Sequence, residues 1–160
     1  KPTLKPVIVI GLGNPLMGDE GIGSAVVGAL AGLAEAGTLP SDRVEYLDGG
    51  CGGMYLLHSI EGRRKAILID CAKMGLAPGS LRRFTPNDVT TVKQMTHLSL
   101  HEVDILRVIE LAELIGQCPE DIVIFGIEPE QISLRMSLTD TLQQRVPDYL
   151  AAVVKEIKYG

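Results

Sequence analysis

The sequence of 160 residues has no tryptophan, and its aromatic side chains are limited to two phenylalanines and four tyrosines. Positively charged residues are also in the minority. The chain has 15 lysines and arginines against 20 aspartates and glutamates, which gives a net charge of −5. Because binding to nucleic-acid phosphates needs a basic face, this balance argues against nucleic acid as a partner. No apolar stretch reaches the roughly 18 residues that cross a bilayer, so we expect no membrane association.

Cysteine is scarce as well. Cys51, Cys71 and Cys118 are odd in number and widely spaced. This spacing fits neither a disulfide framework nor a CxxC zinc motif. The N-terminal residues also lack the apolar core of a signal peptide. We therefore expect a cytoplasmic protein whose thiols are reduced.

What the sequence does contain is an alternation of β-branched runs with helical patterns, over a length typical of one domain, residues 1–160. The expected strands are 7–10, 44–47, 65–69, 80–85 and 122–127, and the expected helices are 22–35, 54–61, 99–115 and 139–158. Such alternation predicts an α/β fold with a mostly parallel sheet and helices on both faces. Gly28 and Gly32 predict close packing of the first helix on the sheet, and Pro147 predicts a kink in the last.

A glycine-rich loop, GLGNPLMGDEGIG at residues 11–23, follows the first strand. A dinucleotide-binding GxGxxG would need glycine at position 16, where Leu16 stands, and a P-loop would need Gly-Lys-Ser/Thr. Asp19 and Glu20 would also repel a phosphate near the helix start. Nucleotide binding is therefore disfavoured, and Asp19 taken alone is interpreted as a helix cap.

Ligands of parallel α/β sheets bind beyond the carboxyl ends of the strands. Glu20 and Asp70 are expected at that edge, and His101 lies in the first turn of a helix, where the neutral, metal-binding imidazole is favoured. If the three converge, two carboxylates and one imidazole suit nickel or zinc. Their spacing matches no compact zinc motif, so helix caps and a surface histidine remain open as alternatives.

The other reactive side chains give weaker signals. No serine stands in a G-x-S-x-G elbow. Cys51 is interpreted as a small residue in a glycine turn, with a thiol nucleophile left open. His58 is expected to be structural within an apolar helix, whereas His97, on a polar loop expected at 86–98, is a possible substrate contact.

The loop at 11–23 resembles the opening signature of the nickel–iron hydrogenase maturation endopeptidases. Further motifs of that family are matched in the same order by DGG at 48–50, IDCA at 69–72, HLSLH at 97–101 and GIEP at 126–129. The resemblance covers essentially the whole chain, and five motifs in order are far more specific than any one of them.

This resemblance implies a three-layer α/β/α sandwich with a five-stranded sheet in order 2-1-3-5-4, strand 4 being antiparallel. It implies an endopeptidase, grouped with the aspartic-type peptidases, that removes the C-terminal extension of a hydrogenase large-subunit precursor after nickel insertion. Glu20, Asp70 and His101 match the catalytic and metal-contacting residues of the family. The nickel belongs to the precursor, with zinc or cadmium as a surrogate. Asp48, Gly49 and Gly50 match a strip that helps to position the substrate.

Three points stay open. A bound ion could polarise the scissile carbonyl, or a carboxylate could act as general base. Peptidyl-tRNA hydrolases also begin with a strand and GLGNP on a related fold, although the acidic charge and Glu20, in place of a histidine, oppose that alternative. A non-catalytic chaperone that binds the precursor's metal site would have the same ligand set. The low aromatic content favours a monomer that meets its partner transiently.

Overall fold

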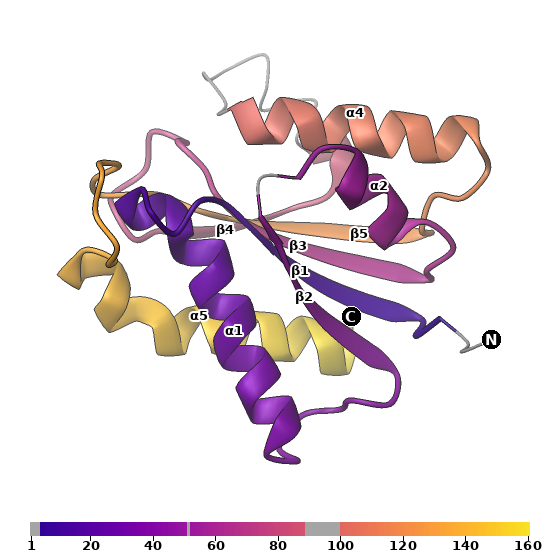
Figure 1. Cartoon of the computed structure of the whole chain (residues 1–160), viewed down its shortest axis with the longest axis horizontal. Helices are drawn as coiled ribbons and strands as arrows, with labels where there is room; N and C mark the ends of the chain where they lie inside the picture. Colours follow the sequence, from indigo (N-terminus) through magenta and orange to yellow (C-terminus); the bar gives the residue numbers. More distant parts are fainter. Residues whose placement is uncertain (1–3, 51, 89–99) are drawn as a thin grey trace.

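A computed structural model describes residues 4–50, 52–88 and 100–160, with the backbone alone for 100–104. Five strands pair in the order β2-β1-β3-β5-β4 (Figure 1). Parallel pairing joins β1 (Val7–Leu12) to β2 (Val44–Gly50) and β3 (Lys65–Cys71), and β3 to β5 (Asp121–Ile127). The edge strand β4 (Leu81–Phe84) runs antiparallel to β5. The predicted strand order and the reversed strand are both confirmed.

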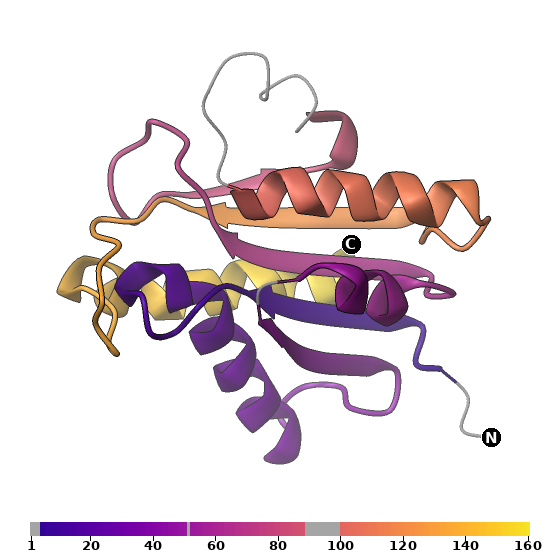
Figure 2. The ribbon, with the colours of Figure 1, turned by 45° about the horizontal axis from the view of Figure 1, so that its top comes forward.

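Helices cover both faces of this sheet, as Figures 1 and 2 show. On one face lie α1 (Ile22–Glu35) and α5 (Asp140–Tyr159), and on the other lie α2 (Met54–Ile60) and α4 (Leu100–Leu114). β1 is buried along its whole length, with Val7 and Val9 facing the α1 side and Ile8 and Ile10 facing the α2 side. A strand buried on both faces is the reason for its continuous apolar run.

The strands run further than their apolar runs predict. β1 continues to Leu12, β2 to Gly50 and β3 to Cys71, because Leu12 pairs with Gly50 and Asp70 with Gly126. The DGG strip and Asp70 therefore lie inside strands, whereas the sequence pattern places them at or after the strand ends. α5 continues through Pro147 without a break.

Gly28 and Gly32 were expected to pack on the sheet, and this is wrong. Both are exposed, and among the described residues no atom lies within 4 Å of where their Cβ atoms would be. Gly23 makes the close approach, because a Cβ there would overlap the carbonyl oxygens of Leu12 and Ile69. The first turn of α1 is thereby held against the carboxyl ends of β1 and β3.

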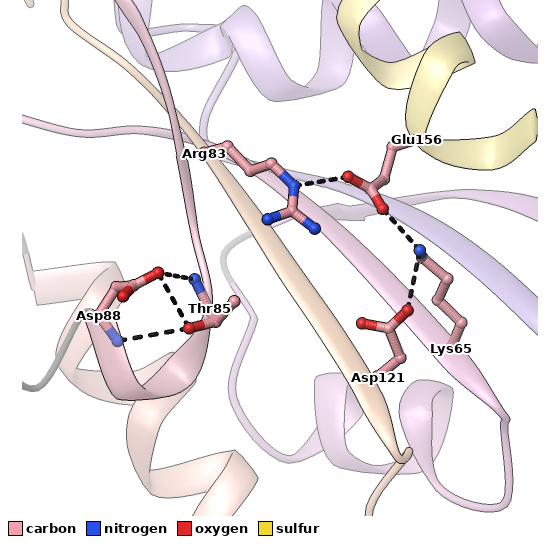
Figure 3. Close-up of polar contacts among 6 residues, drawn as sticks. All are labelled: Lys65, Arg83, Thr85, Asp88, Asp121 and Glu156. Carbon is pink, nitrogen blue, oxygen red and sulfur yellow. Dashed lines mark hydrogen bonds and ion pairs between the residues drawn. The ribbon is translucent and has the colours of Figure 1, made fainter. Parts of the chain in front are cut away.

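The polar segment after β4 begins with a helical turn at residues 86–88, where a loop was expected. The reason is a reciprocal cap, shown in Figure 3: Thr85 donates its backbone N–H and its hydroxyl to Asp88 Oδ2, both at 3.0 Å, and the Asp88 N–H returns a bond to Thr85 Oγ1. Pro86 suits the first helical position because its missing N–H would have no intrahelical partner. Residues 89–99, with His97, and residue 51 lie outside the described residues.

A buried ion network ties α5 to the sheet (Figure 3). Lys65, only 2% exposed, contacts Glu156 at 2.7 Å and Asp121 at 2.9 Å, and Arg83 Nε donates to the other oxygen of Glu156 at 2.6 Å. These residues come from β3, β4, β5 and α5, so the network joins one edge of the sheet to the last helix. Within the described residues, no helix is long and apolar enough to cross a membrane.

Candidate functional site

The carboxyl ends of the parallel strands bring together two of the predicted site residues. Glu20 is half-buried in the 3-10 helix η1 (Gly18–Gly21), which packs against β3. Asp70 is the second-last residue of β3, where it pairs with Gly126 of β5, and it is 0% exposed. The close approach at Gly23 fixes η1 beside β3, so both carboxylates belong to one edge of the sheet.

The thiol of Cys71 reports on the charge at this edge. Burial raises its pKa most, and the negative charges of Asp70, Glu20, Asp19 and Glu128 raise it further. Four carboxylates from three loops or strands therefore act on one point. Such a concentration of negative charge attracts cations, and carboxylates of the kind of Glu20 and Asp70 are suitable ligands for a divalent ion.

The third predicted ligand, His101, lies in the first turn of α4. The helix starts toward the end of the sheet where η1 lies (Figures 1 and 2), but the His101 side chain is outside the described ones. Among the side chains that the structure describes, no group of three or more His, Cys, Asp and Glu residues is arranged to hold a metal ion. The set of Glu20, Asp70 and His101 stays a prediction.

Asp48, the first residue of the DGG strip, lines a hollow of about 290 Å³, which we call the Asp48 hollow. Asp48 Oδ1 accepts the Ser24 hydroxyl at 3.0 Å and the Gly50 N–H at 3.2 Å. The hollow is lined by Pro15, Gly18, Gly21, Ser24, Ala25, Asp48, Met136, Ser137 and Leu138. The Gly13 N–H donates to the Gly50 carbonyl at 2.7 Å, so the strip is attached to the glycine-rich loop. Substrate positioning by the strip stays a prediction.

Asp19 was interpreted as a cap of the following helix, and this is wrong. The N-cap of α1 is Gly21, whereas the fully buried Asp19 carboxylate accepts the backbone N–H groups of Glu130, Gln131 and Thr139 at 2.9, 3.1 and 2.8 Å. Asp19 therefore attaches the segment after β5 to the glycine-rich loop. Sequence gives no signal for this link, since the partners are far apart along the chain.

Glu128 has a role that the sequence analysis did not assign, and His58 differs from its interpretation. Glu128 is 7% exposed, and its Oε1 accepts the N–H groups of Met74 and Leu76, so it joins the segments after β5 and β3. Its position in the GIEP motif was the available signal. His58, expected to be structural, has a side chain that is 69% exposed and pairs with Glu61 at 3.3 Å.

Comparison with known proteins gives a consistent family. A family model described as hydrogenase maturation protease matches residues 29–156, a range that holds Asp70 and His101 but begins after Glu20. The hydrogenase expression/formation protein HupD of Rhodobacter capsulatus is 33% identical over 160 residues, covering 98% of this chain and 74% of that protein. That match therefore includes the glycine-rich loop.

Other relatives differ in length. HupD of Bradyrhizobium diazoefficiens is 35% identical over 123 residues, and the match covers 77% of this chain but 62% of that protein. The coenzyme F420 hydrogenase subunit delta of Methanothermobacter thermautotrophicus is 31% identical over 157 residues, with 94% of each protein covered.

Solved structures share the fold. The hydrogenase maturating endopeptidase HybD from E. coli has a TM-score of 0.83 and 28% identity, over 95% of this chain and 91% of that one. The hydrogenase 2 maturation peptidase from a Thaumarchaeota archaeon has a TM-score of 0.71 and 26% identity, over 98% of this chain and 100% of that one. The chain belongs to the hydrogenase maturation protease family.

Proposed function

We propose that this protein is an endopeptidase that removes the C-terminal extension of a nickel–iron hydrogenase large-subunit precursor once nickel has been inserted. The family supports proteolytic maturation of a hydrogenase and sets aside the peptidyl-tRNA hydrolase alternative. The observation that carries the proposal is the packing of η1, with Glu20, against β3, with Asp70, at the carboxyl edge of the sheet.

In this proposal the nickel is part of the substrate. Glu20, Asp70 and His101 contact it only while the loaded precursor is bound, and two carboxylates with one imidazole are ligands that nickel accepts. Zinc or cadmium, with similar ligand preferences, would serve as surrogates. The negative charge that reaches Cys71 from Asp70 and Glu20 supports a site for a cation at this edge.

The proposal gives Asp70 the central chemical role. Its carboxylate is enclosed by protein, where an electrostatic interaction is stronger than in water. It either contacts the nickel or accepts a proton from the attacking water, the second being the chemistry of an aspartic-type peptidase. Asp48, Gly49 and Gly50 hold the substrate beside it. We further propose that the protein works in the cytoplasm, as a monomer.

The test is cleavage of purified precursor, with and without nickel, followed on gels together with the binding affinity. We expect wild type to cut the loaded precursor and to ignore the empty one. Glu20→Gln and His101→Ala should each weaken binding of the loaded precursor by roughly 10–100-fold, the size of effect seen when a supporting partner of a metal ligand is lost. Glu113→Gln on the exposed face of α4 and the exposed His58→Ala are the matched controls.

Three results would contradict the proposal in different ways. Equal cutting of empty and loaded precursor would show that the protein does not sense nickel. Full activity of Glu20→Gln and His101→Ala would show that neither residue belongs to the site. Tight binding of the loaded precursor with no cutting under any condition would identify the protein as a chaperone.

A further inference from the structure

Large apolar side chains are exposed on the two segments that contribute to the lining of the Asp48 hollow, and one of them, Met136, lines it. Leu134 and Met136 are 86% and 84% exposed, and Leu16 and Ile132 are 50% and 36% exposed. We call these four side chains the apolar rim. Leu16 belongs to the glycine-rich loop, and the other three belong to the segment between β5 and α5. Backbone hydrogen bonds join the two segments, and exposed apolar side chains that gather on neighbouring segments of a soluble protein mark a contact site.

The backbone under the rim is held firmly. Met17 and Arg135 form a β-bridge, the Gly18 N–H donates to the Arg135 carbonyl at 2.7 Å, and the Arg135 N–H donates to the Leu16 carbonyl at 3.0 Å. The buried Asp19 carboxylate fixes the start of the same segment. A surface that is already ordered loses less conformational entropy when it binds, so these side chains are prepared for contact.

The rim is continuous with the candidate site. Met136 also lines the Asp48 hollow, and Gly18, whose N–H holds Arg135, lies in η1 with Glu20. A partner segment that enters the Asp48 hollow therefore meets Met136 of the rim. Leu134 is 86% exposed, and such an apolar side chain suits a depression on the surface of a folded partner, whereas an extended tail needs a hollow.

We propose that the apolar rim docks the folded body of the hydrogenase large-subunit precursor while its C-terminal tail enters the Asp48 hollow. This inference rests on the proposed function and adds the surface that selects the partner. Docking through the rim contributes binding that is the same in the ground state and the transition state. Loss of the rim therefore raises KM and leaves kcat unchanged.

The experiment compares Ile132→Ser/Leu134→Ser, two rim residues that do not line the Asp48 hollow, with a control pair, Leu114→Ser/Ile115→Ser. The control side chains are also exposed, at 82% and 53%, but lie at and just after the end of α4, which leads to the amino end of β5. Affinity for immobilised nickel-loaded precursor, cleavage kinetics and thermal melting are measured for wild type and both variants. We expect the rim variant to bind at least tenfold more weakly, about 1.4 kcal/mol, with its melting temperature and kcat retained. The control pair should behave as wild type.

Equal precursor affinity in wild type and the rim variant would overturn the inference while leaving the proposed function standing. The inference would also be overturned if wild type forms a dimer and the rim variant is a monomer, with precursor binding unaffected. The occupant of the rim would then be a second copy of the chain. If wild type neither binds nor cuts the precursor, the proposed function itself fails, and the inference with it.

Discussion

Asp19 Oδ1 accepts hydrogen bonds from the backbone N–H of Thr139 at 2.8 Å and from its hydroxyl at 3.0 Å, across 120 residues of sequence. Thr139 is the N-cap residue of α5, so Asp19 provides an acceptor and a negative charge at a helix end that has spare N–H groups. One carboxylate thus joins the loop of Glu20 to the start of the last helix.

Asp19→Ala should destabilise the fold. Four donor groups lose a buried, charged acceptor, and we expect a loss of about 3 kcal/mol, or roughly 6–12 °C in melting temperature for a chain of this length. Thermal unfolding followed by circular dichroism measures this. Asp148→Ala is the control, because that side chain is 68% exposed. A melting temperature equal to that of the control would show that the bonds at Asp19 contribute nothing.

Asp70→Asn should abolish processing of the loaded precursor and leave the protein folded. Asparagine keeps the size of the buried side chain but cannot carry the charge that either proposed role requires. Cleavage on gels gives the activity, and the melting temperature confirms the fold. Retained activity would mean that Asp70 only positions its strand through hydrogen bonds.

Cys71→Ala should keep most of its processing activity. The thiol is 3% exposed, and burial together with nearby carboxylates raises its pKa, so at neutral pH it carries its proton and is a poor nucleophile. Alkylation by iodoacetamide in the native state, followed by mass spectrometry, should proceed slowly at Cys71. Loss of turnover in a folded variant would establish thiol catalysis.

Glu156→Gln should be destabilising at neutral pH. The hydrogen bond from Arg83 lowers the pKa of the Glu156 carboxyl, Lys65 adds to the effect, and burial opposes it. Removing this buried charge costs on the order of 1–3 kcal/mol, because Lys65 keeps Asp121 and Arg83 is half-exposed to water. Denaturant unfolding at pH 7 measures the loss, with Glu113→Gln as the control.

The pH dependence has a defined direction. Because the folded pKa of Glu156 lies below the ordinary 4.5, its contribution is complete above that pH and disappears as the pH falls through the lowered value. Wild type and Glu156→Gln should therefore converge in stability in acid. A difference that stays constant from pH 7 to pH 3 would show that ionisation of Glu156 is irrelevant.

Most of the fold could be predicted from the sequence. The β-branched run at Val7 to Ile10 indicates a buried strand, and the resemblance to the hydrogenase maturation endopeptidases implies the strand order that the sheet has. The pattern fails at strand ends, because a polar Asp70 or a glycine pair at 49–50 interrupts the apolar run although the neighbouring strand still pairs with it. Gly28 shows the opposite failure, since spacing alone does not reveal whether a helix face is exposed.

The site could be predicted only in part. Motifs place Glu20 and Asp70 at the same edge, and the parallel sheet brings their segments together. The carboxylates of Asp19 and Glu128 differ, since each acts on backbone N–H groups far away in sequence, which no spacing encodes. The apolar rim could not be predicted either, because the sequence does not show whether a leucine such as Leu134 is buried or exposed.

The network at Lys65 has a consequence for how the chain is made. Lys65 enters the sheet early, but its partner Glu156 follows 91 residues later, after the strands have all been synthesised. Until that residue leaves the ribosome, burial of the Lys65 ammonium is compensated by Asp121 alone. The Lys65 ammonium is therefore fully compensated only after residue 156 has been synthesised, and we expect a nascent chain stopped before that residue to be more open to proteolysis.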